Sequence, residues 1–424
     1  MNLKRVYAVI NTLILRGLGS GVAVLFMITI SRYLPTESAA RFFLLLNIST
    51  IAAVCFRWGL DEVIVRRVAQ LPQNEVVAVG RHLNALSHRR VTILASACLI
   101  ATLAGFHTAF QSVFGSIGLP NLIISLCAAA FVAMTACAAR ILQGRGRNNY
   151  ATFLLNIAVP GLSLIGLFLL VAVKEPNAKD LIALYASVAV VVYLVTTFSL
   201  YGNPLLLFVS GFNIQWRNGD SSAANKLGTV VLAQQAVGWI ALLIVPYAYG
   251  DDAYKGFVVL QKVATLISLT MLAVNFTFSR HFATMYAEGK LKELRQMAVH
   301  SLLAIIVGSF FIIALFIFIR KWLFDYAQIG ADKTALMVVL LVSQVFFSIS
   351  ALFSVILSMA HDDSYLFVTH SLISVAGAVV LVIACQFLPL EVASALLVAS
   401  YFALSVALGL RVRHLTGSAR EIKI

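Results

Sequence analysis

The chain has little charge and few residues that break helices. Only 11% of its 424 residues are charged, and only 8 are proline. Its hydrophilic stretches reach about 25 residues at most, which is too short to bury a hydrophobic core of their own. This excludes a separate soluble domain, and with it the globular catalytic and nucleotide-binding classes of protein.

Motifs for metal, nucleotide or nucleophile chemistry are also missing. The sequence has no GxxxxGK[ST] loop, no HExxH pair and no GxSxG turn, and its 8 histidines show no metal-type spacing. Its 5 cysteines fall within apolar runs and form no CxxC pair. We therefore predict no disulfide, no metal site and no cofactor. The cysteines are Cys55, Cys98, Cys127, Cys137 and Cys385.

What the chain has instead is apolar sequence. Hydrophobic residues make up 61% of it, and the mean hydropathy is +0.95. Runs of about 20 residues recur along the whole length, each long enough to cross a bilayer of about 30 Å as a helix. Because these runs do not alternate, they exclude a barrel. The pattern predicts an all-α polytopic membrane protein with about twelve transmembrane helices in two six-helix lobes. The expected spans are 7–33, 42–65, 88–109, 120–141, 151–173, 181–201, 227–249, 256–278, 298–320, 334–358, 364–386 and 391–411.

The basic residues indicate an orientation. With both termini in the cytoplasm, the inner loops carry most of the 31 lysines and arginines, as the positive-inside rule requires. Lys4 and Arg5 precede a first apolar run that is longer than that of a signal peptide, so we expect a membrane anchor there. Anionic lipid head groups account for the net charge of +14, and no nucleic acid partner is expected.

The two halves of the chain resemble one another at an offset of roughly 214 residues. Residues 65–69 after the second span match 279–283 after the eighth, and 143–150 match 359–365. Two parallel repeats are typical of transporters that hold substrate between two lobes and expose it alternately to each side. The expected parts are an N-terminal six-helix lobe at 1–201, a cytoplasmic linker at 202–226, and a C-terminal six-helix lobe with a short basic tail at 227–424.

Three cations fall inside predicted spans. Arg16 lies on the first span, Arg57 on the second and Lys262 on the eighth. A charge in hydrocarbon costs several kcal/mol, so such residues usually face a watery cavity or the interior of the helix bundle. This predicts an interior that handles something anionic. The alternative is that Arg16 and Lys262 snorkel to the membrane interfaces and that Arg57 is neutralised by Asp61, four residues later.

Asp61 and Glu62 are the carboxylates expected at membrane depth. A carboxylate in such a place can take up a proton near neutral pH, which makes Asp61 the candidate for coupling to a proton or sodium ion. The alternative is a structural ion pair with Arg57, Arg66 or Arg67 at the cytoplasmic end of the span, and we favour it for Glu62.

Uncharged polar residues within spans can bind sugar hydroxyls or neighbouring helices, and the second use is the commoner. The candidates for sugar contacts are Asn47, Gln234 and Asn275.

Three segments carry a resemblance to a known family. They are ISRYLPTESAARFFLLLNI at 30–48, WGLDEVIVRRVAQ at 58–70 and ILQGRGRNNYATFLLN at 141–156. They are similar to the recurring patterns "aRyLg…e.fG.f.l", "fGl…aliReva" and "L.G.gr…y…n" of the polysaccharide-transporter (Wzx-type) flippases, in the multidrug/oligosaccharidyl-lipid/polysaccharide exporter superfamily. Ala39 and Ala40 replace the usual glycine of the first pattern, so no single motif is diagnostic.

The resemblance implies a protein of the bacterial inner membrane that turns an undecaprenyl-diphosphate-linked oligosaccharide, such as an O-antigen unit for lipopolysaccharide biosynthesis, towards the periplasm. It implies that Arg16, Arg57 and Lys262 bind the diphosphate around a central cavity, a task that suits cationic side chains and the guanidinium fork above all. It also implies membrane lipids, a polysaccharide polymerase and a chain-length regulator as partners, and no enzymatic activity.

Two other classes remain open. A multidrug/cation antiporter of the same superfamily is expected to present acidic residues to its substrate, whereas the charges within these spans are mostly basic. A membrane-embedded polysaccharide polymerase needs a sizeable outer loop with catalytic carboxylates, and the expected outer loops are short.

Overall fold

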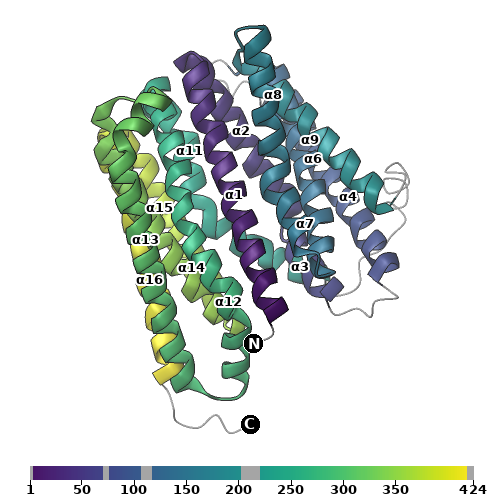
Figure 1. Cartoon of the computed structure of the whole chain (residues 1–424), viewed down its shortest axis with the longest axis vertical. Helices are drawn as coiled ribbons and strands as arrows, with labels where there is room; N and C mark the ends of the chain where they lie inside the picture. Colours follow the sequence, from purple (N-terminus) through teal and green to yellow (C-terminus); the bar gives the residue numbers. More distant parts are fainter. Residues whose placement is uncertain (1–2, 70–75, 107–116, 202–219, 418–424) are drawn as a thin grey trace. The chain divides into compact units, whose positions relative to one another are not determined.

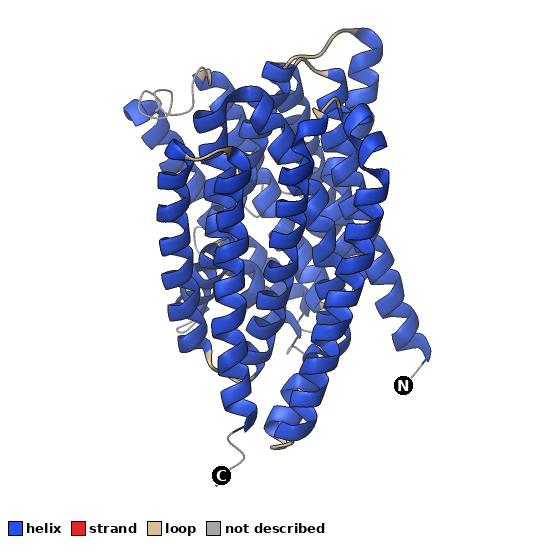
Figure 2. Ribbon diagram, turned by 90° about the vertical axis from the view of Figure 1, so that its left-hand side faces the viewer, coloured by secondary structure: helices blue, strands red, loops and turns tan. Residues whose placement is uncertain are grey.

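The computed structural model describes residues 3–69, 76–106, 117–201 and 220–417. These residues form helices joined by short connections, with no strand among them, as Figure 2 shows. The all-α prediction is therefore confirmed. The helices are α1 Leu3–Tyr33, α2 Thr36–Arg57, α3 Leu60–Ala69, α4 Val76–Ala101, η1 Thr102–Phe106, α6 Leu119–Gly144, α7 Asn148–Phe153, η2 Leu154–Ala158, α8 Val159–Val173, α9 Ala178–Tyr201, α11 Asp220–Ala264, η3 Thr265–Ile267, α12 Ser268–Ala287, α13 Leu291–Ala327, η4 Ala331–Lys333, α14 Thr334–Met359, α15 Asp363–Phe387 and α16 Leu390–Gly417.

The described residues contain 10 helical stretches that are long and apolar enough to cross a membrane. The sequence predicted two more, for two reasons. The seventh and eighth predicted spans form one continuous stretch, Gly228–Leu272, which is bent where Gly250 adopts a non-helical φ of 77°. The third predicted span lies on α4 and η1, and its last residues fall outside the described part of the chain. The chain is thus a multi-pass membrane protein.

By internal packing the chain divides into two compact units. The N-terminal unit comprises Ile14–Leu232 and Val245–Lys255, and the C-terminal unit comprises Met1–Leu13, Ala233–Ile244 and Gly256–Ile424. Most of the linker expected at 202–226 lies outside the described residues, so the lobe boundaries expected there remain a prediction.

Helix α6 is the centre of the N-terminal unit. It packs against α2, α3, α4 and α9, and its alanines Ala128, Ala129 and Ala133 are fully buried. Small side chains let neighbouring backbones approach closely, which is how helices associate in lipid. Figure 1 shows the resulting close approach of α6 to α9.

Helix α14 has the same place in the C-terminal unit. It packs against α12, α13, α15 and α16, and its buried face includes Ser343, Ser348 and Ser350. Each of these hydroxyls donates to a carbonyl three or four residues earlier in α14. The buried polar atoms are thereby satisfied without a partner on another helix.

The internal repeat is visible in the helix boundaries and in the turns. The α6–α7 turn has an Arg147 N–H donating to the Leu142 carbonyl at 2.9 Å, and the α14–α15 turn has the equivalent bond from Asp362 to Leu357 at 3.0 Å. Pairs of helices begin 215 residues apart: α4 and α13 at Val76 and Leu291, α6 and α14 at Leu119 and Thr334, and α7 and α15 at Asn148 and Asp363.

Proline explains the one π-helical segment between α7 and α8. Pro160 has no N–H, so the carbonyl of Asn156 loses its helical partner, and the chain widens into η2. The backbone of α1 lies directly against this segment at Gly19. A methyl group at Gly19 would come within 2.6 Å of the Asn156 Cβ, whereas methyl groups at Gly17 and Gly21 would meet nothing within 4 Å.

We expect Gly19→Ala to lower the unfolding temperature in detergent, because α1 and η2 must separate to admit the methyl group. Gly17→Ala is the matched control on the same helix, and it should leave the temperature unchanged or raise it slightly through better helix propensity. Thermal unfolding of the purified protein measures both. Equal shifts in the two variants would show that α1 does not pack on η2 through Gly19.

Candidate functional site

Arg57 is the last residue of α2, which ends there and not at residue 65 as predicted. Its Nε donates to the Ala53 carbonyl at 3.1 Å, and that carbonyl belongs to the last turn of the helix, where orphan acceptors and the helix dipole both favour a cation. Arg57 therefore lies at the end of its span. The helix is shorter than predicted because Trp58 and Gly59, the next two residues, do not continue it.

Trp58 and Gly59 form a sharp corner between α2 and α3. Both adopt left-handed backbone conformations, with φ of 39° and 74°, which ends α2 and starts α3 in a new direction at Leu60. The left-handed region is costly for a bulky residue, and such strain persists only where the surroundings enforce it. Here the corner lies on the first turns of α11, since a methyl group at Gly59 would come within 2.3 Å of the Ala224 carbonyl.

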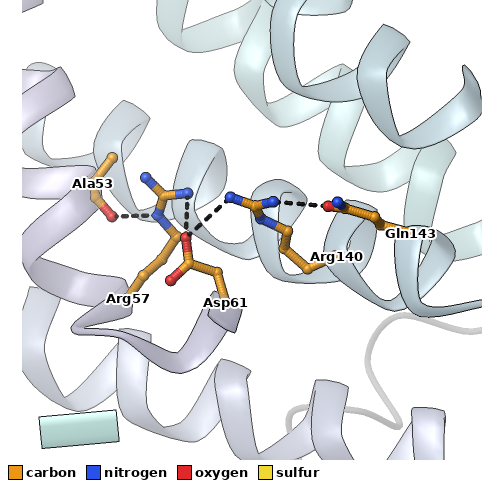
Figure 3. A network of polar contacts seen from close by, with 5 residues as sticks. All are labelled: Ala53, Arg57, Asp61, Arg140 and Gln143. Atoms are coloured by element: carbon orange, nitrogen blue, oxygen red, sulfur yellow. Dashed lines mark hydrogen bonds and ion pairs between the residues drawn. The ribbon is translucent and has the colours of Figure 1, made fainter. Parts of the chain in front are cut away.

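The corner brings Asp61 back towards Arg57. Arg57 Nη1 donates to Asp61 Oδ2 at 3.3 Å, and the same oxygen lies 3.8 Å from Arg140 Nη2. Figure 3 shows the carboxylate between the two guanidinium groups. All three side chains are partly exposed, by 15% for Arg57, 17% for Asp61 and 22% for Arg140.

Arg140 is a site residue that the sequence analysis missed. It lies in the last part of α6, and Gln143, also on α6, accepts a bond from its Nη1 at 2.7 Å. The signal was available, because residue 140 falls just inside the fourth predicted span. From the sequence alone Arg140 counts among the inner-loop cations, because only the fold brings α6 to the α2–α3 corner.

Arg16 belongs to the same group. It lies near the start of the apolar part of α1 and is half-buried, and Arg140 is close enough to act on it electrostatically. We refer to Arg16, Arg57, Arg140 and Asp61 as the arginine cluster. Among the described side chains, the cluster contains three guanidinium groups and one carboxylate.

Buried apolar side chains pack next to the arginine cluster. Cys137 is fully buried on α6, within electrostatic range of Arg57, Asp61 and Arg140. Leu60, Ile64, Leu83 and Ile141 pack around it. Because buried apolar side chains form a low-dielectric medium, they strengthen the interactions of the charges beside them.

Lys262, the third cation expected at the site, lies in the C-terminal unit near the end of α11 and is half-buried. Its carbonyl accepts the Thr265 hydroxyl at 2.6 Å, and the chain then tightens into the 3-10 turn η3. A 3-10 turn within a long helix often marks a hinge.

The predicted sugar contacts have different surroundings. Asn47 is buried in the N-terminal unit, and its Nδ2 donates to the Tyr254 hydroxyl at 3.0 Å, which is the interhelical use that the sequence left open. Gln234 is half-buried on α11. Asn275 lies on α12, and its side chain, like that of Glu62, is outside what the structure describes.

Two buried histidines were not singled out by the sequence analysis. His88 Nε2 lies 2.9 Å from the Tyr193 hydroxyl, and His370 Nε2 lies 2.9 Å from the Ser354 hydroxyl. Neither belongs to a metal site, because the described residues contain no group of three or more His, Cys, Asp or Glu side chains that could hold an ion. None of the five cysteines, all of which lie within the described residues, forms a disulfide.

Several solved structures share this arrangement of helices. An inward-facing multidrug resistance MATE family transporter of the MOP superfamily aligns over 98% of this chain and 100% of its own, with a TM-score of 0.74 and 14% identity. An outward-facing MATE transporter aligns over 98% and 97%, with a TM-score of 0.67 and 14% identity. The fold is that of the MATE transporters.

A third neighbour is a MOP superfamily transporter from Pyrococcus furiosus, reported to have a binding pocket of reversed polarity that suggests a different function. It aligns over 98% of this chain and 96% of its own, with a TM-score of 0.67 and 14% identity. No family model and no curated protein sequence matches the chain.

We expect Gly59→Ala to destabilise the protein strongly, since the new methyl group meets both a left-handed backbone and the α11 carbonyl. Gly146→Ala is the matched control, because Gly146 has a similar φ of 78° but open space around it. The control should lose about 1–2 kcal/mol, the ordinary cost of a left-handed L-residue. Denaturant or thermal unfolding in detergent measures the difference. Equal losses would mean that α11 does not pack on the corner.

Proposed function

We propose that the chain is a flippase that moves an undecaprenyl-diphosphate-linked oligosaccharide across the bacterial inner membrane by alternating access. The observation that carries this proposal is the arginine cluster, in which Arg57 and Arg140 share the Asp61 carboxylate and Arg16 lies within electrostatic range of Arg140. A net positive site at the end of membrane helices is suited to an anionic head group, and guanidinium groups bind phosphate without losing their protons.

The fold supports the transport part of the proposal. MATE neighbours are known in inward-facing and outward-facing conformations, so a chain of this fold has two states between which a bound head group can change sides. The motif resemblance at 30–48, 58–70 and 141–156 supports a lipid-linked oligosaccharide as cargo. In this role both termini are cytoplasmic, and a polymerase and a chain-length regulator act on the product outside.

A multidrug or cation antiporter is the second candidate, because the neighbours with this fold include multidrug resistance transporters. An organic cation needs a site with excess negative charge, and the arginine cluster has the opposite sign. The Pyrococcus furiosus neighbour indicates that proteins of this fold differ in the polarity of their pockets. The sign of the charge therefore favours the flippase for this chain.

The energy source remains a prediction. Without a nucleotide-binding motif, movement must be drawn by consumption of the product or coupled to an ion gradient, and a gradient supplies about 2.3 kcal/mol per charge per 100 mV. Asp61 is the candidate for such coupling. In reconstituted vesicles, an imposed pH gradient should then change the flipping rate of wild type and not of Asp61→Asn.

We expect Arg16→Ala and Arg57→Ala to abolish surface polysaccharide in cells that depend on this protein, at nearly normal protein level. Arg57→Lys should rescue in part, because the charge is kept and the bidentate fork is lost. Arg41→Ala is the matched control, since Arg41 also pairs with a carboxylate four residues away on α2, Glu37, and both are exposed.

Two outcomes would contradict this role. An active Arg57→Ala protein, or an active Arg57→Ala/Asp61→Ala double variant, would make Arg57 a structural partner of Asp61. Purified protein in vesicles should also move a prenyl-diphosphate-linked sugar and fail to move a fluorescent organic cation. The reverse result would favour the antiporter.

A further inference from the structure

The ion pair at the α2–α3 corner is arranged more loosely than a structural salt bridge. Asp61 offers one oxygen to both arginines, at 3.3 Å from Arg57 and at 3.8 Å from Arg140. The second distance is too long for a hydrogen bond, and neither guanidinium makes two parallel bonds to Asp61. Both contacts use the same Asp61 oxygen, Oδ2.

The partial exposure of Arg57, Asp61 and Arg140 allows one partner of the ion pair to be replaced. A fully buried pair would leave an uncompensated charge in a low-dielectric interior when separated. Here each side chain keeps between 15% and 22% of its surface exposed, so a ligand can replace one partner without leaving the other fully buried. Asp61 can therefore leave the arginines without unfolding the corner.

The charge of the two arginines matches one class of ligand. A diphosphate diester carries about two negative charges, one on each phosphate as in nucleic acid. A diphosphate that binds Arg57 and Arg140 would place one phosphate near each guanidinium group, where the Asp61 carboxylate lies between them. The ligand and Asp61 are both anions, so they compete for the same two cations.

We propose that Asp61 is a built-in counter-ion that holds the place of the substrate's diphosphate between Arg57 and Arg140 and is displaced when the diphosphate binds. This rests on the proposed function and adds to it the way in which the site releases its cargo. In the empty protein Asp61 keeps the arginines paired, and after transport it competes with the diphosphate for them. Asp61 thus weakens binding and speeds release.

The test is the affinity of purified protein in detergent for a prenyl-diphosphate-linked monosaccharide, measured by calorimetry or thermophoresis. Asp61→Asn should bind about tenfold more tightly than wild type, a difference of about 1.4 kcal/mol, because the diphosphate no longer competes with a carboxylate for the two arginines. Its flipping rate in vesicles should fall although its affinity rises. A purely structural Asp61 would give weaker binding on substitution.

Asp362→Asn is the matched control. Asp362 pairs with Arg411 at 2.7 Å, and its side chain is also 17% exposed, so the variant loses the same charge from a pair elsewhere in the chain. It should bind the probe as wild type does. Arg57→Ala/Asp61→Asn should show little of the gain seen in Asp61→Asn alone, because one of the competing partners is gone.

The outcomes separate this inference from the proposed function. If wild type does not bind the probe, the proposed function fails. If wild type binds and folded Asp61→Asn binds equally or less tightly, or if Asp362→Asn gains as much, the counter-ion role fails alone. Asp61→Ser removes the same charge in a smaller side chain, and it decides the question if Asp61→Asn is poorly folded.

Discussion

A charge held in hydrocarbon costs several kcal/mol, and this cost determines where the charges of the N-terminal unit lie. Arg57 and Arg140 are near the ends of α2 and α6, where helix carbonyls and partial exposure reduce the cost. Asp61 lies between them because the chain turns sharply at Trp58 and Gly59. The described part of the cluster thus brings three guanidinium groups near one carboxylate. Such a concentration of cationic donors is the feature on which the proposed anionic ligand rests.

The internal repeat separates what the fold needs from what the site needs. Helix boundaries and the α6–α7 and α14–α15 turns recur 215 residues apart, down to matching backbone hydrogen bonds. The arginine cluster does not recur, because its counterparts in the second half are apolar. If the cluster were needed only for helix packing, a similar cluster would be expected in both halves of the chain. At that offset, Arg16, Arg57 and Arg140 correspond to Val231, Leu272 and Val355.

The sequence predicted the helices well, because long apolar runs leave the backbone no alternative in lipid. It also singles out Arg16 and Arg57 as candidates, since charges inside apolar runs stand out, and their role stays a prediction. It placed the end of α2 wrongly because 42–65 is uniformly helix-forming, apart from Gly59, and a single glycine does not by itself show a corner. Arg140 was missed for a different reason. Arg140 reaches the cluster because α6 packs on α3. A contact between two distant segments cannot be predicted from the residue pattern of either segment alone.

The corner also connects the cluster to another part of the chain. Arg57 and Asp61 lie on either side of the corner, and the hydrogen bond between them joins its two sides. The outer face of the corner lies on Ala224 and Gly228, in the first turns of α11. Beyond Leu232 the same helix continues into the C-terminal unit. In the proposed mechanism, a diphosphate that displaces Asp61 would break the Arg57–Asp61 bond across the corner on which the first turns of α11 lie. Binding at the arginines and the packing of α11 on the corner would then be linked through a single hydrogen bond.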